Sequence, residues 1–301
     1  MLLQLYPRQS VSYYCRLFGY TRQAFYSWRN MPEKDGMREA IVLKLVNEIR
    51  TQLPRCGTEK LHYLLRPKLL AHNIKMGRDA LYSLLGKHGY LIRWRRRKPY
   101  TTNSFHLFKK YPNRIRDLII DRAGQLWVSD ITYIRLQKGF CYLSLITDAY
   151  SHKIVGYKLH PTLAAEGAID ALLMASSDHK TTSSLIHHSD RGIQYCCADY
   201  VREIERLHIQ LSMTEKGDPY ENAVAERVNG ILKQEHGLGQ TFSNYTQAVE
   251  AVEKAVNTYN HLRPHDSCNR LTPIVAHEQK GVLQKLWKPK KYKPKVPLID
   301  G

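Results

Sequence analysis

The fold is decided by the stretch Val128-Ser129-Asp130-Ile131-Thr132-Tyr133, an acidic residue within β-branched and aromatic neighbours. After 59 further residues comes a second acid, Asp190, in His188-Ser189-Asp190-Arg191-Gly192. After 35 more residues comes Glu226, which ends Asn222-Ala223-Val224-Ala225-Glu226. The surrounding patterns place each acid at a strand end or on the inner face of a helix. Three acids brought together in this way would hold two divalent cations.

The segments around these acids follow an α/β pattern. Three short runs rich in β-branched and aromatic residues predict an antiparallel meander over 126–135, 140–147 and 153–159. Beyond them, helices are predicted over 163–176, 198–207, 220–236 and 246–260, and strands over 184–188 and 209–213. Hairpin strands followed by alternating helices and strands predict an α/β domain with a mixed sheet.

Other acids near the motifs are explained by local structure. Asp218 fits an N-cap with Glu221 as its capping-box partner, which makes Glu221 structural. Glu221 also lies about 140° around the helix from Glu226, so the two do not share a face. Lys233 does share the face of Glu226 and is a candidate phosphate contact, with a solvated lysine as the equal alternative. Asp148 is interpreted as the cap of a strand or turn.

Charge is distributed unevenly along the chain, whose formal net charge is +19. Residues 1–116 carry +18 and residues 280–301 carry +6, whereas residues 117–279 carry −5. A basic excess on this scale is typical of nucleic-acid binding, with a solvated basic surface as the alternative. No apolar run approaches the roughly 20 residues that span a membrane. With no secretory signal and no disulfide spacing among six cysteines, a reduced, cytoplasmic protein is expected.

The first part of the chain is predicted to be helical and to contact DNA. Residues 10–30 fit two short helices around Gly19, and the apolar residues of the second helix share one face. This pattern fits a helix-turn-helix, although any small helical hairpin would give it too. The side chains expected to contact DNA lie off the apolar face and are Arg22, Gln23 and Arg29.

A second helical DNA-binding unit is predicted from helices over 37–53, 58–65 and 78–87. It ends in a cluster of five cations around Trp94, namely Arg93, Arg95, Arg96, Arg97 and Lys98. Guanidinium groups pair with phosphates and the indole can stack on a base, while a solvated linker is the alternative. The basic C-terminal tail is predicted either to lie along a DNA backbone or to be a solvated extension. The predicted division is a helix-turn-helix over 1–30, this unit over 31–98, a linker over 99–120, a catalytic domain over 121–279 and a basic tail over 280–301.

Several segments together resemble one family, the insertion-sequence transposases of the DDE type (B-frame product). The resemblance is carried by residues 127–134, 188–195 and 216–226, and by 259–265 with 271–273. It implies a ribonuclease H-like catalytic domain similar to retroviral integrase, in which a mixed five-stranded sheet is flanked by helices. It further implies metal-dependent cleavage at the element's ends and joining of a 3′-hydroxyl to new DNA. Asp130, Asp190 and Glu226 would hold two Mg²⁺ or Mn²⁺ ions.

The resemblance also sets expectations about partners. Terminal inverted repeats and target DNA are the expected duplexes, and bringing two ends together suggests a homo-oligomer on DNA. The family's usual partner-frame protein is not part of this chain, and the zinc module of retroviral integrases is absent from the sequence. Where many members have a small residue after the third acid, this chain has Arg227. Two rival hypotheses are a DNA-binding protein with an inactive core and a nuclease that never joins strands.

Overall fold

The computed structural model describes residues 10–92, 108–177, 184–215 and 222–287, with the backbone alone for residues 27–35. The chain divides into two compact units, Met1–Gln52 with Cys56–Arg93, and Leu53–Arg55 with Trp94–Gly301. The predicted basic cluster Arg93–Lys98 and the predicted N-cap Asp218 lie outside the described residues. The domain boundaries expected from the sequence stay predictions.

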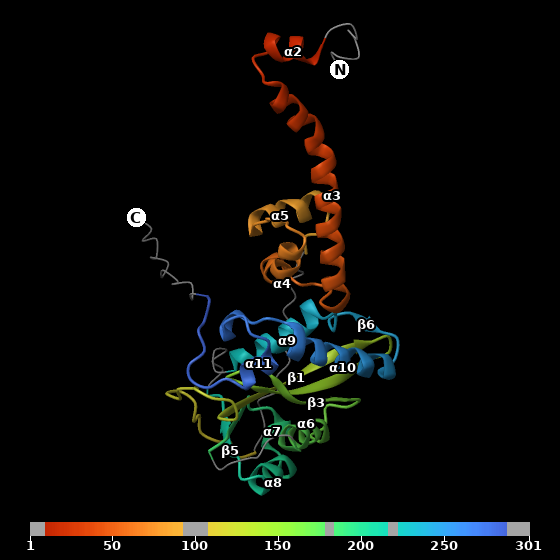
Figure 1. Cartoon of the computed structure of the whole chain (residues 1–301). Helices are drawn as coiled ribbons and strands as arrows, with labels where there is room; N and C mark the ends of the chain where they lie inside the picture. The colour runs from red at the N-terminus through yellow and green to blue at the C-terminus, as the bar shows by residue number, and fades with distance from the viewer. Residues whose placement is uncertain (1–9, 93–107, 178–183, 216–221, 288–301) are drawn as a thin grey trace, which may run out of the picture. The chain divides into compact units, whose positions relative to one another are not determined.

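The described part of the first unit is helical (Figure 1). Its helices are α2 (Val11–Leu17), α3 (Arg22–Gln52), α4 (Thr58–Ala71) and α5 (Arg78–Lys87). The hydroxyl of Ser10 accepts a hydrogen bond from the Tyr13 N–H and so caps α2. Between α2 and α3 the chain turns at Gly19, whose φ of +69° favours glycine. Buried aliphatic side chains from three helices form the core, among them Val42, Val46, Leu61, Leu65, Leu81 and Leu85.

Helix α3 corrects one expectation from the sequence. Two separate helices were expected, one ending by Asn30 and one starting at Met37, but α3 runs from Arg22 to Gln52 without a break. Helix α3 contains both Pro32 and Gly36, which disfavour a helix interior by about 3 and about 1 kcal/mol relative to alanine, and it continues through both. The predicted turn at Gly19 is present, but the helix that follows is much longer than a helix-turn-helix requires.

The second unit is built on a mixed sheet with the strand order β3-β2-β1-β4-β5. Strands β1 (Leu126–Leu136), β2 (Phe140–Asp148) and β3 (Ile154–His160) form an antiparallel meander, which confirms that prediction. Strands β4 (Ile186–Ser189) and β5 (Gln210–Met213) continue the sheet parallel to β1. A two-residue strand not expected from the sequence, β6 (Thr241–Phe242), also pairs with β1.

Helices cover both faces of this sheet (Figure 1). On one face, Trp127 and Ile146 pack in a core with α6 (Glu166–Ser177) and α8 (Ala198–Arg206). On the other face, Ile134 and Leu143 pack with α9 (Ala223–Glu235) and α10 (Tyr245–Leu262). The short elements are α7 (Ile193–Cys196), a 3₁₀ turn η1 (Asp266–Cys268) and α11 (Pro273–His277). Within the described residues, no helix combines the length and apolarity needed to cross a membrane.

Candidate active site

Asp130 lies within β1, and Asp190 follows directly after β4, the parallel neighbour of β1. In the register of these strands Val128 pairs with His188, so both acids come two residues after the same paired position. Neighbouring strands lie about 4.8 Å apart, and side chains two residues further along a strand return to the same face. The sheet therefore brings the first two acids of the sequence motif side by side.

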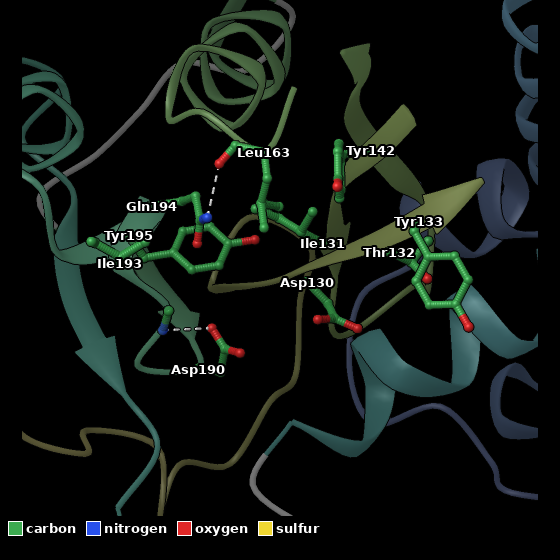
Figure 2. A pocket seen from close by; sticks show the side chains of 11 residues that line it. Asp130, Ile131, Thr132, Tyr133, Tyr142, Leu163, Asp190, Ile193, Gln194 and Tyr195 are labelled. Carbon is green, nitrogen blue, oxygen red and sulfur yellow. Dashed lines mark hydrogen bonds between the residues drawn. The ribbon is translucent and has the colours of Figure 1, made fainter. Parts of the chain in front are cut away.

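The two carboxylates line one pocket with a volume of about 270 Å³. Tyr133, Tyr142 and Tyr195 contribute to the wall of this pocket. Figure 2 shows Asp130 and Asp190 at the same pocket. The Asp190 side chain is oriented by the N–H of Gly192, which donates to its Oδ1 at 3.0 Å. A side chain at Gly192 would place its Cβ 3.0 Å from that same oxygen, so glycine leaves this carboxylate undisturbed.

Glu226 lies in the first turn of α9, which two amides attach to β1. Asn222 Nδ2 donates to the carbonyl of Ser129 at 3.0 Å, and Asn229 Nδ2 donates to Asp130 Oδ2 at 2.8 Å. Glu226 comes four residues after Asn222 and three residues before Asn229, so the three side chains share one side of the helix. The docking of α9 therefore turns the face that carries Glu226 toward β1.

The beginning of α9 differs from the sequence expectation. The helix begins at Ala223 with Asn222 at the N-cap position, rather than near Pro219. The physical reason is that the Asn222 side chain is hydrogen-bonded to the carbonyl of Ser129 on β1. This contact fixes the position at which the chain enters the helix. Asn229 was not identified from the sequence, although its place three residues after Glu226 is a signal that could have found it.

The third acid is close to the pair but is not on the pocket wall. Glu226 is exposed, and its charge contributes to the field at Asp130. Among the residues that the structure describes, no three His, Cys, Asp or Glu side chains are near enough to one another to hold a metal ion. The structure thus pairs Asp130 with Asp190 in one pocket, whereas Glu226 is not among the residues that line it.

The pocket brings acids close enough together to change the pKa of Asp130. Burial, the charge of Asp190 and, to a smaller extent, the charge of Glu226 raise the pKa of Asp130 to about 7, against the hydrogen bond from Asn229. The nearby Lys233 does not remove this effect. Burial lowers the pKa of Lys233 while Asp130 opposes that shift, and its Nζ lies 4.1 Å from the Tyr133 ring centroid. A bound cation would relieve the repulsion among these acids.

A stability measurement checks this electrostatic description. Because the folded-state pKa of Asp130 lies above its usual value, folding is penalised increasingly as the pH rises toward 7. Without divalent metal, we expect Asp130→Asn to stabilise the protein by roughly 2 kcal/mol more at pH 8 than at pH 5. Urea unfolding of the parent and the variant at the two pH values gives the difference in free energy of unfolding. Equal stabilisation at both pH values would contradict the raised pKa of Asp130.

Asp148 supplies a matched control of opposite sign. Burial acts to raise its pKa, but the nearby His277 and the hydrogen bonds from the N–H groups of Gly124 and Ser151 outweigh burial and lower it. As predicted, Asp148 caps a turn, with Gly124 N–H on Oδ2 at 2.8 Å and Ser151 N–H on Oδ1 at 2.9 Å. A carboxylate with a lowered pKa stabilises the folded state above its unfolded pKa. Asp148→Asn should therefore destabilise the protein at both pH 5 and pH 8.

Two buried histidines support β4 and carry no charge near neutral pH. Burial lowers the pKa of His187 to about 3 and that of His188 to about 4. His187 Nε2 shares a hydrogen bond with the Tyr200 hydroxyl, and His188 Nδ1 shares one with the Ser212 hydroxyl, each at 2.9 Å. These contacts fix β4 against α8 and β5, and thereby fix the strand that presents Asp190.

The predicted DNA-contact residues are placed only in part. Arg22 and Gln23 are exposed at the start of α3. Arg29 lies in the same helix, within the stretch for which only the backbone is described. Lys233 lies next to the acid pocket on α9. The residues outside the described part of the chain are Arg93, Arg95, Arg96, Arg97 and Lys98.

A meander continued by two parallel strands, with one acid on β1 and the other directly after the adjacent β4, defines the ribonuclease H-like class of fold. Two integrase core domain models match residues 121–219 and 207–273. The chain is 33% identical over 270 residues to the insertion element IS600 31 kDa protein of Shigella sonnei, covering 88% of this chain and 97% of that protein. It is 28% identical over 273 residues to the transposase InsF for insertion sequence IS3A of Escherichia coli, covering 88% and 92%. The chain belongs to the insertion-sequence transposases with an integrase core, which are DDE polynucleotidyl transferases.

Two solved structures align with part of this chain. The catalytic core domain of HTLV-2 integrase, in complex with magnesium, aligns with a TM-score of 0.42 at 20% identity, covering 52% of this chain and 97% of that one. A chain of the simian T-cell lymphotropic virus intasome aligns with a TM-score of 0.46 at 19% identity, covering 79% of each chain.

Proposed function

We propose that this transposase cleaves DNA at the ends of its insertion sequence and joins the resulting 3′-hydroxyl to target DNA, in a metal-dependent reaction. The observation that carries the proposal is the pair Asp130 and Asp190, which line one pocket from neighbouring parallel strands. Phosphodiester transfer develops negative charge on both the attacking and the leaving oxygen. A pocket that concentrates acids is suited to this reaction only together with cations.

The donor set fits Mg²⁺ or Mn²⁺. Hard cations prefer carboxylate oxygens, and burial together with the charge of Asp190 raises the pKa of Asp130, so a bound cation would favour its charged form. In the proposal Asp130, Asp190 and Glu226 are the catalytic residues and hold two ions, with Glu226 supplied by α9. Such ions would activate the nucleophilic oxygen and stabilise the departing one. Asn229 keeps Asp130 in place, and Gly192 keeps Asp190 in place.

The basic parts of the chain would position the DNA. We assign Arg22, Gln23 and Arg29 to the terminal inverted repeats, and Arg93 with Arg95 to Lys98 to phosphates of the end or the target. Lys233 lies beside the acid pocket and would contact a phosphate next to the scissile one. The proposed assembly is a homo-oligomer that holds two ends and associates with the nucleoid in the bacterial cytoplasm, with a partner-frame protein as an additional component.

The direct test incubates the full chain with labelled duplexes that carry the element's ends, with and without Mg²⁺ or Mn²⁺. Joined products that require metal support the proposal. Nicked products without any joining would indicate a nuclease, and a shifted band without metal-dependent products would indicate a binding protein. The inverted repeats in the DNA that flanks the gene identify the end sequence for these duplexes.

The basic cluster Arg93–Lys98, predicted at the end of the second helical unit, gives a separate prediction. Replacing Arg95, Arg96 and Arg97 by alanine should weaken binding to all duplexes, because phosphate contacts do not depend on sequence. The slope of log K against log salt concentration should fall by about one for each lost contact. Fluorescence anisotropy over a range of salt concentrations measures this slope. An unchanged slope would show that the cluster is a solvated linker.

A further inference from the structure

Helix α5 has one face in the core and one face in solvent. Leu81, Leu84 and Leu85 are buried against the rest of the first unit. On the opposite side lie two pairs spaced four residues apart, Arg78 with Tyr82 and Asp79 with Ser83, all exposed. The side chain of Tyr82 is 56% exposed. The exposed face therefore combines a cation, an aromatic ring and hydrogen-bonding groups on one stripe.

The start of α5 is held in place by the two preceding helices. In the turn before it, the carbonyl of Met76 shares a hydrogen bond with His62 Nε2 of α4 at 3.0 Å. The neighbouring carbonyl of Lys75 accepts a hydrogen bond from Arg38 Nη2 of α3. Because this turn is tied to both helices, the exposed face of α5 is presented rigidly. A rigid stripe of side chains is suited to recognising a partner of fixed shape.

The ion pair on this face orients its arginine. Arg78 Nε lies 2.8 Å from Asp79 Oδ1, and the two side chains are 62% and 86% exposed. A pair this exposed adds little to stability, so its main consequence is the direction of the guanidinium group. Nε is used in this contact, and the two terminal amino groups are the part of the fork that can bind bidentately. That geometry matches the O6 and N7 acceptors of guanine in the DNA major groove.

Charge and size favour duplex DNA over a protein partner. Residues 36–93 contain 11 Lys and Arg residues against 4 Asp and Glu, a net charge of +7. A helix with its side chains is about 10–12 Å across, and the major groove is about 12 Å wide. We propose that α5 enters the major groove and recognises bases, with Arg78 on guanine and Tyr82 and Ser83 on the adjacent positions. This inference rests on the proposed function for its substrate, but it assigns sequence recognition to α5, separate from Arg22 and Gln23 at the start of α3.

The test uses the full chain without divalent metal, so that binding is measured apart from chemistry. A pool of duplexes with a randomised central segment is enriched on the protein, and affinities are then compared for an enriched and a scrambled duplex. We expect Arg78→Ala to weaken binding to the enriched duplex by about 5- to 150-fold and to change binding to the scrambled duplex little. Arg78→Lys, which keeps the charge but loses the fork, should lower the same ratio.

Two further variants make the outcome specific. Arg66→Ala removes an equal charge from an exposed position of α4 and should leave the ratio of the two affinities unchanged. Asp79→Ala removes a negative charge and the orienting contact, so it should strengthen binding to the scrambled duplex and still lower the ratio. Failure to enrich any sequence, or equal ratios for Arg78→Ala and Arg66→Ala, would overturn the assignment of α5. Failure of the proposed function would appear instead as absent strand joining with binding intact.

Discussion

Asp190→Asn is expected to abolish cleavage and strand joining together, with each rate falling at least about a thousandfold, equivalent to 4 kcal/mol of barrier. The substitution keeps the size of the side chain, and its amide oxygen can still accept the hydrogen bond from Gly192. What it removes is the negative charge that a cation shared with Asp130 would need. Labelled-duplex assays with Mg²⁺ and Mn²⁺ measure both steps.

DNA affinity separates loss of chemistry from loss of the protein's fold or its DNA contacts. We expect Asp190→Asn to bind duplexes at least as tightly as the parent, because it removes a negative charge near the substrate. Asp199→Asn is the matched control, since Asp199 is an exposed residue of α8 paired with Arg202. That control should retain parental activity. An Asp190→Asn protein that joins strands at the parental rate would show that the acid pair is not the catalytic centre.

The sequence was sufficient to predict the strands that carry the acids. Runs of β-branched and aromatic residues around Asp130 mark β1 and its meander, because a strand buried on both faces has to be apolar on both. The resemblance then supplied the ribonuclease H-like mixed sheet flanked by helices, which the structure confirms. The pairing of Val128 with His188, which makes Asp130 and Asp190 neighbours, follows from that order.

Features that depend on contacts between distant segments could not be predicted in this way. The contact between Asn229 and Asp130 joins residues 99 positions apart. The spacing of three residues from Glu226 places Asn229 on the same helix face, but its partner on β1 depends on how α9 packs on the sheet. The start of α9 is set by Asn222 on Ser129, which overrides the capping pattern seen upstream in the sequence. The length of α3 was also missed: the local penalties at Pro32 and Gly36 favour two separate helices, yet α3 runs through both positions. For Asn229 and for the start of α9, a tertiary contact decided the outcome.

Arg263→Ala is expected to lower the free energy of unfolding by about 3–5 kcal/mol, because it leaves a buried carboxylate without its partner. Arg263 binds Glu235 through two hydrogen bonds of 2.7 Å, from Nε and Nη2, and its Nη1 lies 3.0 Å from His265 Nε2. The side chains of the pair are only 3% and 11% exposed. For a unit of this size the loss corresponds to a fall in Tm of roughly 6–20 °C, measurable by thermal unfolding.

The control is Arg270→Ala, which breaks a more exposed pair with Asp266 four residues away and should cost about 1 kcal/mol or less. Replacing both Arg263 and Glu235 by methionine should recover much of the loss, because no unpaired buried charge remains. Glu235 is the last residue of α9, the helix whose first turn carries Glu226. If the pair anchors this helix, metal-dependent joining by Arg263→Ala should fall even at temperatures where the variant remains folded. Equal losses of stability in Arg263→Ala and Arg270→Ala would show that the buried pair does not hold α9 in place.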